Sequence, residues 1–455
     1  MTEAKLHPAS YKDPAGFVFE QDGIIFRHVN PLYAKAYEQL MASGLYKQLT
    51  GAKQLVVHEE LKENISGSAA FYKTLLPEPI PFISYAYEWS FDMLKDAALL
   101  TLQICKQAIA HGMVLKDATP YNIQFVEGRP VFIDTLSFEL YQATKPWIAY
   151  RQFCEEFLVP LLLSHYTGSD LGSLLLAYTD GIPVALCARL LPFRSRFNLL
   201  SLLHIHLQSG VQSNAQAAHA TKSFSKQKFL HILDHLANGI GSLHAGAAKS
   251  TWSDYYVQTI KSKEYLEEKK AVFIRLLKQA PAGSALDLGA NTGVFARLLA
   301  AHCKQVVACD FDSRAINQLY LDIKKEPGPI LPLVIDISHP TPAIGWENKE
   351  RASFLQRQQY DLVAALALIH HLVIGKNIPL QQLAACFYTL CKKFLLIEFV
   401  EREDEKVKIL LERKELAYAH YTRRSFEEVF AHHFDLVTFH VLSDGLRVLY
   451  LWRKK

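Results

Sequence analysis

Asp287-Leu288-Gly289-Ala290-Asn291-Thr292-Gly293 completes an apolar, strand-like stretch and leads into a helical pattern. Glycine lacks a Cβ atom, so Gly289 and Gly293 permit a sharp turn and let a ligand lie against bare main chain. Unpaired N–H groups at the start of the following helix would face that ligand. The stretch therefore predicts a strand, a glycine loop and a helix that together form a ligand site.

A carboxylate follows the next strand. Residues 305–309 are an apolar stretch that ends at Asp310, about twenty residues after the loop. A carboxylate in this place can accept hydrogen bonds from ribose hydroxyls. A dinucleotide fingerprint, G-x-G-x-x-G, would need glycine where Asn291 stands. The pattern indicates a nucleoside-bearing cofactor, and the dinucleotide fingerprint is incomplete.

Three motifs occur in order: Asp287-x-Gly289-x-Asn291-x-Gly293, then Asp310, then Asp336 after a third strand. This order resembles the first three motifs of class I S-adenosylmethionine-dependent methyltransferases. The resemblance implies that Gly289 and Gly293 cradle the methionine portion of the cofactor, Asp310 the ribose and Asp336 the adenine edge. The negative charge of Asp287 suits a cofactor with a sulfonium and an ammonium group. Many members have glycine at position 291, so the loop conformation can differ. The alternative is an ordinary tight strand-to-helix turn.

The rest of the C-terminal half predicts a doubly wound α/β sheet. Residues 360–367 and 394–399 are apolar runs suited to parallel strands buried on both faces. Residues 434–441 and 447–452 flank Ser443-Asp444-Gly445, as in a hairpin at a sheet edge. Strands alternating with helices predict right-handed crossovers. We therefore expect a Rossmann-like methyltransferase sheet with an antiparallel closing hairpin.

Three residues are candidates for catalysis: His370, His371 and Glu398. All three lie at or beyond the ends of predicted strands, where ligands of such sheets bind. A histidine could accept a proton from a hydroxyl or amine nucleophile, and adjacent side chains diverge, so at most one should face the cleft. The alternatives are a histidine hydrogen-bonded to a carbonyl and a glutamate that caps a helix or forms a salt bridge.

Several strings resemble a bacterial family of methyltransferase-related proteins named after a rhizobial nodulation protein: Trp89-Ser90-Phe91, Leu115-Lys116-Asp117, Ile133-Asp134-Thr135-Leu136-Ser137-Phe138-Glu139, Ala365-Leu366-Ala367-Leu368-Ile369-His370-His371-Leu372 and Glu398-Phe399-Val400. The likeness covers most of the chain. It strengthens the cofactor assignment and leaves the methyl acceptor open. We expect an oxygen or nitrogen nucleophile on a small molecule or a glycolipid precursor.

The N-terminal half carries a second pattern. Asp117 precedes Asn122 by five places, the spacing of the kinase catalytic loop, and Asp134 follows a predicted hairpin strand. This resembles the catalytic region of protein kinases and aminoglycoside phosphotransferases. The resemblance implies that Asp117 orients a hydroxyl, while Asn122 and Asp134 hold Mg²⁺ on ATP phosphates. Arg27 would stand in for the phosphate-pairing lysine.

The N-terminal half also departs from that family. Leu115 replaces the loop histidine, Thr135-Leu136 replaces Phe-Gly, no G-x-G-x-x-G is present, and an arginine cannot act as a compact ammonium. A degenerate kinase-like domain that binds a substrate or a partner fits better than an active one. A mixed helical and hairpin domain, in which Asp117 and Asn122 cap turns, remains the alternative. A phosphotransferase or nucleotide-binding scaffold is thus a second functional hypothesis.

Length and composition suggest two domains. We predict an N-terminal α+β domain over residues 1–208, a linker and bridging helix over 209–250, and the methyltransferase domain over 251–455. Trp252, Tyr255 and Tyr256 could close over the cofactor or pack between the domains.

The charge balance and cysteine usage limit the function classes further. The 49 basic residues are spread along the chain and outnumber the 45 acidic ones by only four, which is no nucleic-acid footprint. No continuous apolar segment reaches the length of a membrane span, and the N-terminus lacks a secretory signal. Seven cysteines without C-x-x-C pairs suggest reduced thiols in the cytoplasm and no zinc module. The oligomeric state stays open.

Overall fold

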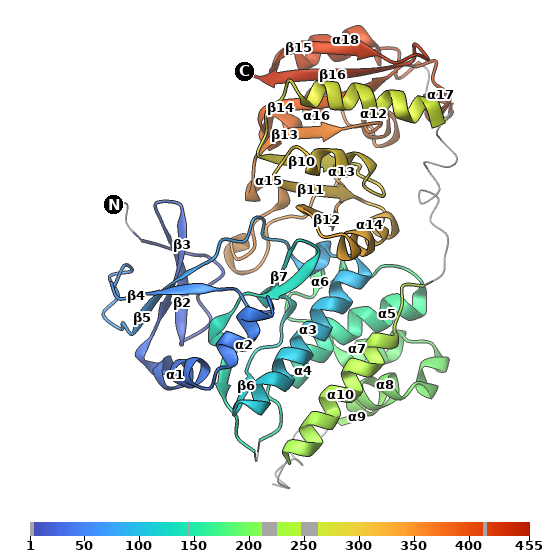
Figure 1. Cartoon of the computed structure of the whole chain (residues 1–455). Coiled ribbons are helices and arrows are strands. Elements are labelled where there is room, and N and C mark those ends of the chain that lie inside the picture. The colour runs from blue at the N-terminus through green and yellow to red at the C-terminus, as the bar shows by residue number, and fades with distance from the viewer. Residues whose placement is uncertain (1–3, 144, 212–224, 247–262, 413–415) are drawn as a thin grey trace. The chain divides into compact units, whose positions relative to one another are not determined.

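The computed structural model describes residues 4–143, 145–211, 225–246, 263–412 and 416–455 (Figure 1). The chain divides into two compact units. The N-terminal unit comprises Met1–Ala248 together with Ala343–Ala352, and the C-terminal unit comprises Lys249–Pro342 and Ser353–Lys455. Each unit has its own sheet, and each is described by itself below.

The C-terminal unit contains a seven-stranded sheet in the order β12-β11-β10-β13-β14-β16-β15. The strands are β10 Ser284–Leu288, β11 Gln305–Asp310, β12 Ile330–Val334, β13 Tyr360–Ala365, β14 Cys391–Val400, β15 Phe434–Val441 and β16 Arg447–Lys454. The first five run parallel, and β16 is antiparallel to both β14 and β15. The predicted doubly wound sheet with its antiparallel closing hairpin is confirmed.

Helices alternate with these strands: α12 Lys263–Leu277, α13 Val294–Ala300, α14 Ser313–Lys325, α15 Phe354–Arg357, α16 Leu380–Leu390, α17 Glu405–Leu411 and α18 Arg423–Phe430. The central strands carry almost only apolar residues because helices cover them. Phe273 of α12, Phe295 of α13 and Leu319 of α14 pack with Ala285 of β10 in one buried cluster. α16 packs against β13, β14 and α18.

The loop after β10 needs three residues with positive φ. Gly289 and Gly293 have φ of 76° and 81°, and Asn291 has φ of 50°. Asparagine is one of the few L-residues that visit this region readily, and the Asn291 Oδ1 accepts a hydrogen bond from the N–H of Thr292 at 2.7 Å. Asn291 therefore adopts a left-handed conformation of the kind that glycine adopts freely.

The N-terminal unit begins with a five-stranded antiparallel sheet in the order β1-β2-β3-β5-β4. Its elements are β1 Lys5–Leu6, β2 Gly16–Gln21, β3 Ile24–Val29, α1 Ala34–Ala42, α2 Leu45–Gly51, β4 His58–Leu61 and β5 Lys73–Pro77. The long helix α3, Phe91–Ala110, then leads to two short antiparallel pairs. They are β6 Met113–Leu115 with β9 Phe138–Leu140, and β7 Ile123–Val126 with β8 Arg129–Phe132.

Helices make up the rest of the N-terminal unit: α4 Tyr150–Phe153, α5 Val159–Thr167, α6 Leu174–Ala177, α7 Val184–Leu190, α8 Leu199–Ser201, α9 Leu207–Val211 and α10 Lys226–Ser242. α10 packs along α3 (Figure 1), where Lys106 pairs with Asp234 at 2.6 Å. Among the described residues, no helix combines the length and apolar character that a membrane span requires.

Parts of the predicted domain organisation lie beyond the described ranges. Residues 212–224 and 247–250 of the predicted linker, and Trp252, Tyr255 and Tyr256, fall outside them. The predicted boundary between residues 250 and 251 therefore stays a prediction. The predicted bridging helix corresponds in sequence to α10, which belongs to the N-terminal unit.

Gly293 is the loop residue whose replacement should cost most. A Cβ at Gly293 would lie 2.4 Å from the Cδ1 of Leu319, and the backbone φ is 81°. We expect Gly293→Ala to lower the free energy of unfolding by about 2–5 kcal/mol. The cost of an alanine in left-handed backbone and the cost of overpacking against Leu319 add to each other. Urea denaturation of the full chain measures the loss.

Gly328→Ala is the matched control, because a Cβ there meets nothing within 4 Å. Its free energy of unfolding should stay within about 1 kcal/mol of the wild type. Equal stability of the two variants would contradict the close approach of the loop to α14.

Candidate active site

A cavity of about 270 Å³ lies at the carboxyl ends of the parallel strands in the C-terminal unit. Ligands of open α/β sheets bind at this edge, where the strand order reverses between β10 and β13. The residues lining the cavity include Asp287, Gly289, Asn291, Asp310, Asp336 and His371. Gly293 is not among the lining residues, since its bare Cα faces Leu319 of α14.

Asp310 is held by the main chain at the end of β11. Its Oδ2 accepts a hydrogen bond from the N–H of Asn291 at 2.8 Å, and its Oδ1 accepts one from the N–H of Asp312 at 2.9 Å. The main chain of Phe311 hydrogen-bonds the carboxylate as well, and a carboxylate has about four lone-pair sites in all. Burial raises the pKa of Asp310 to about 6, although the hydrogen bonds from Asp312 and Asn291 oppose that shift. The carboxylate is thus fixed against the glycine loop and keeps acceptor capacity.

Asp287 is a buried carboxylate with an unused oxygen. Its side chain is only 2% exposed, and its Oδ2 has no hydrogen-bond partner among the described residues. Burial and the nearby charge of Asp310 raise the pKa of Asp287 to about 7, although the charge of Lys269 and a hydrogen bond from the main chain of Ala296 oppose the shift. A buried carboxylate oxygen without a partner is costly, so this position favours a cationic or hydrogen-bond-donating ligand.

Asp336 follows β12 and is more accessible. Its Oδ1 accepts hydrogen bonds from the N–H of Ser338 at 2.8 Å and from the Ser338 hydroxyl at 2.6 Å. Lys376 lies 3.5 Å from its Oδ2. Burial would raise the pKa of Asp336, but these hydrogen bonds and the charge of Lys376 lower it overall. Asp336 is therefore an ionised rim residue of the cavity.

A buried ion pair supports the cavity wall. The Nζ of Lys269, from α12, lies 2.6 Å from the Oε2 of Glu398 on β14. The same oxygen accepts a hydrogen bond from the N–H of Ala367 at 2.7 Å. Ala367 lines the cavity with φ of 50°, a region that costs an alanine roughly 1 kcal/mol or more. Glu398 thus holds a strained segment of the wall in place.

A second buried cation completes this network. The guanidinium of Arg447, on β16, lies 3.1 Å from Asp404 and 3.7 Å from Glu398. Arg447 and Lys269 both line the cavity, whereas Glu398 is completely buried behind it. Removing one partner of such a buried pair typically costs about 3–5 kcal/mol. The network fixes β14, β16 and α12 around the cavity.

The two candidate histidines lie in different environments. His371 lines the cavity, whereas His370 is completely buried and is not a lining residue. Neither ring nitrogen of His370 has a hydrogen-bond partner among the described residues. Burial, together with the charges of Arg447 and Lys406, lowers the pKa of His371 to about 4. The structure therefore brings His371 to the cavity and leaves His370 and Glu398 out of it.

Sequence analysis missed Lys269, Arg447 and Ala367. A signal for Lys269 exists in the pattern of α12, because the lysine precedes Val272 and Phe273 by three and four places and so shares their apolar face. A lysine on the buried face of a helix indicates a buried partner. Arg447 and Ala367 have no comparable local signal, because their roles depend on pairing between distant strands.

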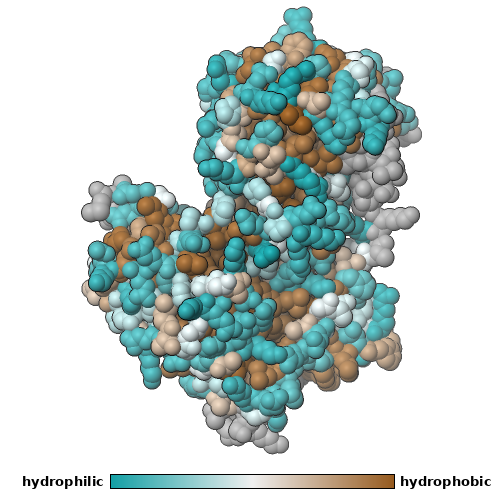
Figure 2. Space-filling view, in the orientation of Figure 1, coloured by the Kyte–Doolittle hydropathy of each residue, from teal (hydrophilic) through white to brown (hydrophobic). Residues whose placement is uncertain are grey.

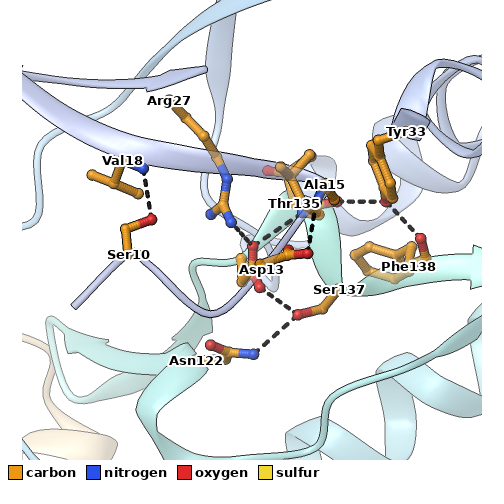
Figure 3. Close-up of polar contacts among 12 residues, drawn as sticks. Ser10, Asp13, Ala15, Val18, Arg27, Tyr33, Asn122, Thr135, Ser137 and Phe138 are labelled. Carbon is orange, nitrogen blue, oxygen red and sulfur yellow. Dashed lines mark hydrogen bonds and ion pairs between the residues drawn. The ribbon is translucent and has the colours of Figure 1, made fainter. Parts of the chain in front are cut away.

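Polar contacts connect several of the predicted kinase-like residues of the N-terminal unit, and Figure 3 shows Arg27 and Asn122 among them. Arg27 lies 2.6 Å from the Oδ1 of Asp134, which also accepts a hydrogen bond from the N–H of Leu136 at 3.0 Å. Asn122 donates to the Ser137 hydroxyl at 3.0 Å, and that hydroxyl donates to the Oδ2 of Asp134. Both carboxylate oxygens of Asp134 are thus engaged by the protein itself.

Asp117 lies near this network, and burial raises its pKa with a further increase from the charge of Asp134. Within the described ranges, no group of three or more histidine, cysteine, aspartate or glutamate side chains is arranged to hold a metal ion. The predicted Mg–ATP site at Asp117, Asn122 and Asp134 finds no support in this arrangement.

The chain is similar to known proteins in sequence and in structure. It is 31% identical to nodulation protein NoeA of Rhizobium meliloti (strain 1021), over 98% of this chain and 95% of that protein. The N-methyltransferase NodS of Bradyrhizobium japonicum WM9 is a structural neighbour with 15% identity, coverage of 43% of this chain and 99% of NodS, and a TM-score of 0.32.

Magnesium protoporphyrin IX methyltransferase ChlM of Synechocystis PCC 6803, with bound S-adenosylhomocysteine, is another structural neighbour. It has 11% identity, coverage of 46% of this chain and 90% of ChlM, and a TM-score of 0.32. No protein-family model matches the chain.

The raised pKa of Asp287 predicts a pH-dependent effect of replacing it. Between about pH 4 and pH 7 the folded protein keeps a proton on Asp287 that the unfolded chain loses, so this group makes the folded state less stable as pH rises. An asparagine side chain at this position cannot ionise. We therefore expect Asp287→Asn to gain stability relative to the wild type from pH 5 to pH 8, measured by urea denaturation without added ligand.

Asp361→Asn is the control in the same sheet. Burial would raise the pKa of Asp361, but hydrogen bonds from the main chain and Lys393 lower it overall, so it is ionised throughout this pH range. Asp361→Asn should therefore lower the free energy of unfolding by the same amount at every pH from 5 to 8. A constant difference for Asp287→Asn as well would contradict a buried, partly protonated Asp287.

Proposed function

The chain belongs to the family of nodulation protein NoeA, and from this premise we propose that its C-terminal unit is an S-adenosylmethionine-dependent methyltransferase. The observation that carries the proposal is the convergence of Asp287, Asp310 and Asp336 on one cavity. Asp287 and Asp310 lie at the carboxyl ends of β10 and β11, and Asp336 comes shortly after β12, the next strand of the sheet. The sheet order, with its closing antiparallel hairpin, is that expected for class I methyltransferases.

The residues of the cavity suit the chemical groups of this cofactor. The Asp287 Oδ2, which has no partner among the described residues, can accept a hydrogen bond from the ammonium group, and the carboxylate charge balances that group. Asp310 can accept hydrogen bonds from ribose hydroxyls. Phe311 lines the cavity with an exposed ring on which an adenine base can lie, and Asp336 can meet the edge of that base.

Methyl transfer requires little further chemistry from the chain. When bound, S-adenosylmethionine supplies a methyl group on a sulfonium leaving group. The protein then has to orient the acceptor in line with that methyl group and to exclude water. The Lys269–Glu398 pair and the strained Ala367 keep the cavity wall rigid, which favours such positioning.

His371 is the residue best placed to accept a proton from the acceptor. It lines the cavity, and its lowered pKa keeps the imidazole neutral near pH 7. A neutral imidazole can take a proton from a hydroxyl or an ammonium as the new bond to the methyl group forms. We infer an oxygen or nitrogen nucleophile on a small molecule or a glycolipid precursor as the acceptor.

Binding of S-adenosylhomocysteine tests the cofactor assignment. Isothermal titration calorimetry of the full chain should give micromolar affinity, about −8 kcal/mol. Asp310→Ala should weaken binding at least tenfold, because the ribose loses its acceptor and the loop loses its anchor on Asn291. Asp322→Ala, a surface carboxylate on α14, is the control and should bind as the wild type does. Absence of binding by a folded wild-type chain would overturn the proposal.

The role of His371 predicts a split between binding and turnover. His371→Asn should keep its affinity for S-adenosylhomocysteine within about threefold and lose about a hundredfold or more in methyl transfer, the usual contribution of a general base. Transfer is measured from methyl-labelled S-adenosylmethionine into the small-molecule and lipid fractions of a cell extract. Transfer by His371→Asn at the wild-type rate would remove His371 from the chemistry.

A further inference from the structure

A long basic stretch in the N-terminal unit has no role in the cavity described above. The sequence contains no aspartate or glutamate between Asp180 and Asp234, although 45 of its 455 residues are acidic. The same stretch includes Arg189, Arg194 and Arg196. Local charge is therefore positive over the elements α7, η6 (Phe193–Phe197), α8, η7 (Leu202–His206) and the start of α9.

These elements also expose an unusual number of apolar side chains. Six of them are more than two-fifths exposed: Leu190, Phe193, Phe197, Leu199, Leu203 and Leu207. Phe193 and Phe197 are 71% and 78% exposed. Their rings contact each other edge to face, with the ring centroids 5.6 Å apart. Figure 2 shows brown residues at the lower right margin, where α8 lies in Figure 1. Clustered exposed apolar side chains indicate an interaction surface. We name these elements, residues 184–209, the basic apolar face.

The arginines lie among these apolar side chains. The guanidinium of Arg196 lies 5.7 Å from the ring centroid of Phe193. A hollow of about 510 Å³ opens in the same face and is lined by Arg189, Arg196, His206 and Ser209, with Leu202 and Leu207 beside them. Within the described part of the chain, no acidic residue lines it. The hollow therefore offers cationic and hydrogen-bonding groups to an anion at the level of an apolar surface.

We propose that the basic apolar face docks this protein on an anionic lipid surface. Phenylalanine and leucine side chains enter the boundary between headgroups and acyl chains, while arginines bind lipid phosphates. The hollow at Arg189 and Arg196 receives a headgroup. An anionic lipid surface matches both the arginines and the exposed apolar side chains. A neutral apolar partner would leave the arginine charges without counter-charges, and a soluble anion would leave the phenylalanines in water.

Vesicle co-sedimentation of the full chain tests the proposal. The wild type should bind vesicles of phosphatidylcholine with one-third phosphatidylglycerol at least tenfold more tightly than vesicles of phosphatidylcholine alone, and added salt should weaken that binding. Phe193→Ser/Phe197→Ser should lose at least tenfold in affinity. Arg189→Gln/Arg196→Gln should lose the preference for anionic vesicles, since each positive charge raises the affinity for an anionic surface about fivefold.

Leu32→Ser/Trp346→Ser is the matched control, because Leu32 and Trp346 are exposed to a similar extent, 75% and 69%, outside the basic apolar face. This variant should bind vesicles as the wild type does. All substituted side chains are exposed, so thermal melting should show the variants folded. Equal loss in the control would show that any exposed apolar residue suffices and would overturn the proposal.

The same samples distinguish other occupants of the face. Light scattering measures whether the wild type self-associates and whether Phe193→Ser/Phe197→Ser abolishes that association. Self-association without vesicle binding would assign the face to a second copy of this chain and overturn the proposal. A wild type that binds glycerol phosphate in solution but neither kind of vesicle would overturn it too.

Discussion

Buried carboxylates at one edge of the C-terminal sheet set the constraint on which this unit depends. Asp287, Asp310, Glu398 and Asp404 are each at most 8% exposed. Lys269 and Arg447 pair with Glu398 and Asp404. Among the described residues, no cation forms an ion pair with Asp287 or Asp310. The edge therefore carries an excess of buried negative charge, which a protein tolerates only by protonation or by binding a cation.

The surrounding structure follows from this constraint. The glycine loop, with positive φ at Gly289, Asn291 and Gly293, supplies the N–H of Asn291 to Asp310. Glu398 is neutralised by Lys269 and in turn holds the strained Ala367 at the wall. The cavity thus combines rigid walls with two carboxylates whose charge is not yet balanced. A methyl donor with sulfonium and ammonium groups supplies that balance.

The sequence predicted the C-terminal fold well, because buried parallel strands such as β10 are nearly continuous apolar runs and glycine loops have strong local requirements. It could not separate His370 from His371, since the structure turns one into the core and the other toward the cavity. The partners of Glu398 come from α12 and β16, far away along the chain. In the N-terminal half, the sequence spacing predicted that Asn122 and Asp134 lie close together. It did not predict that Arg27 forms an ion pair with Asp134.

Proton release on cofactor binding tests the central claim most directly. Asp287, with a pKa of about 7, is mostly protonated at pH 6.5 and should ionise when a cationic ligand binds. Calorimetric titration with S-adenosylmethionine in buffers of different ionisation enthalpy counts the protons released. The account predicts release of a large fraction of one proton at pH 6.5, lost in Asp287→Asn. Tight binding without proton release in the wild type would contradict it.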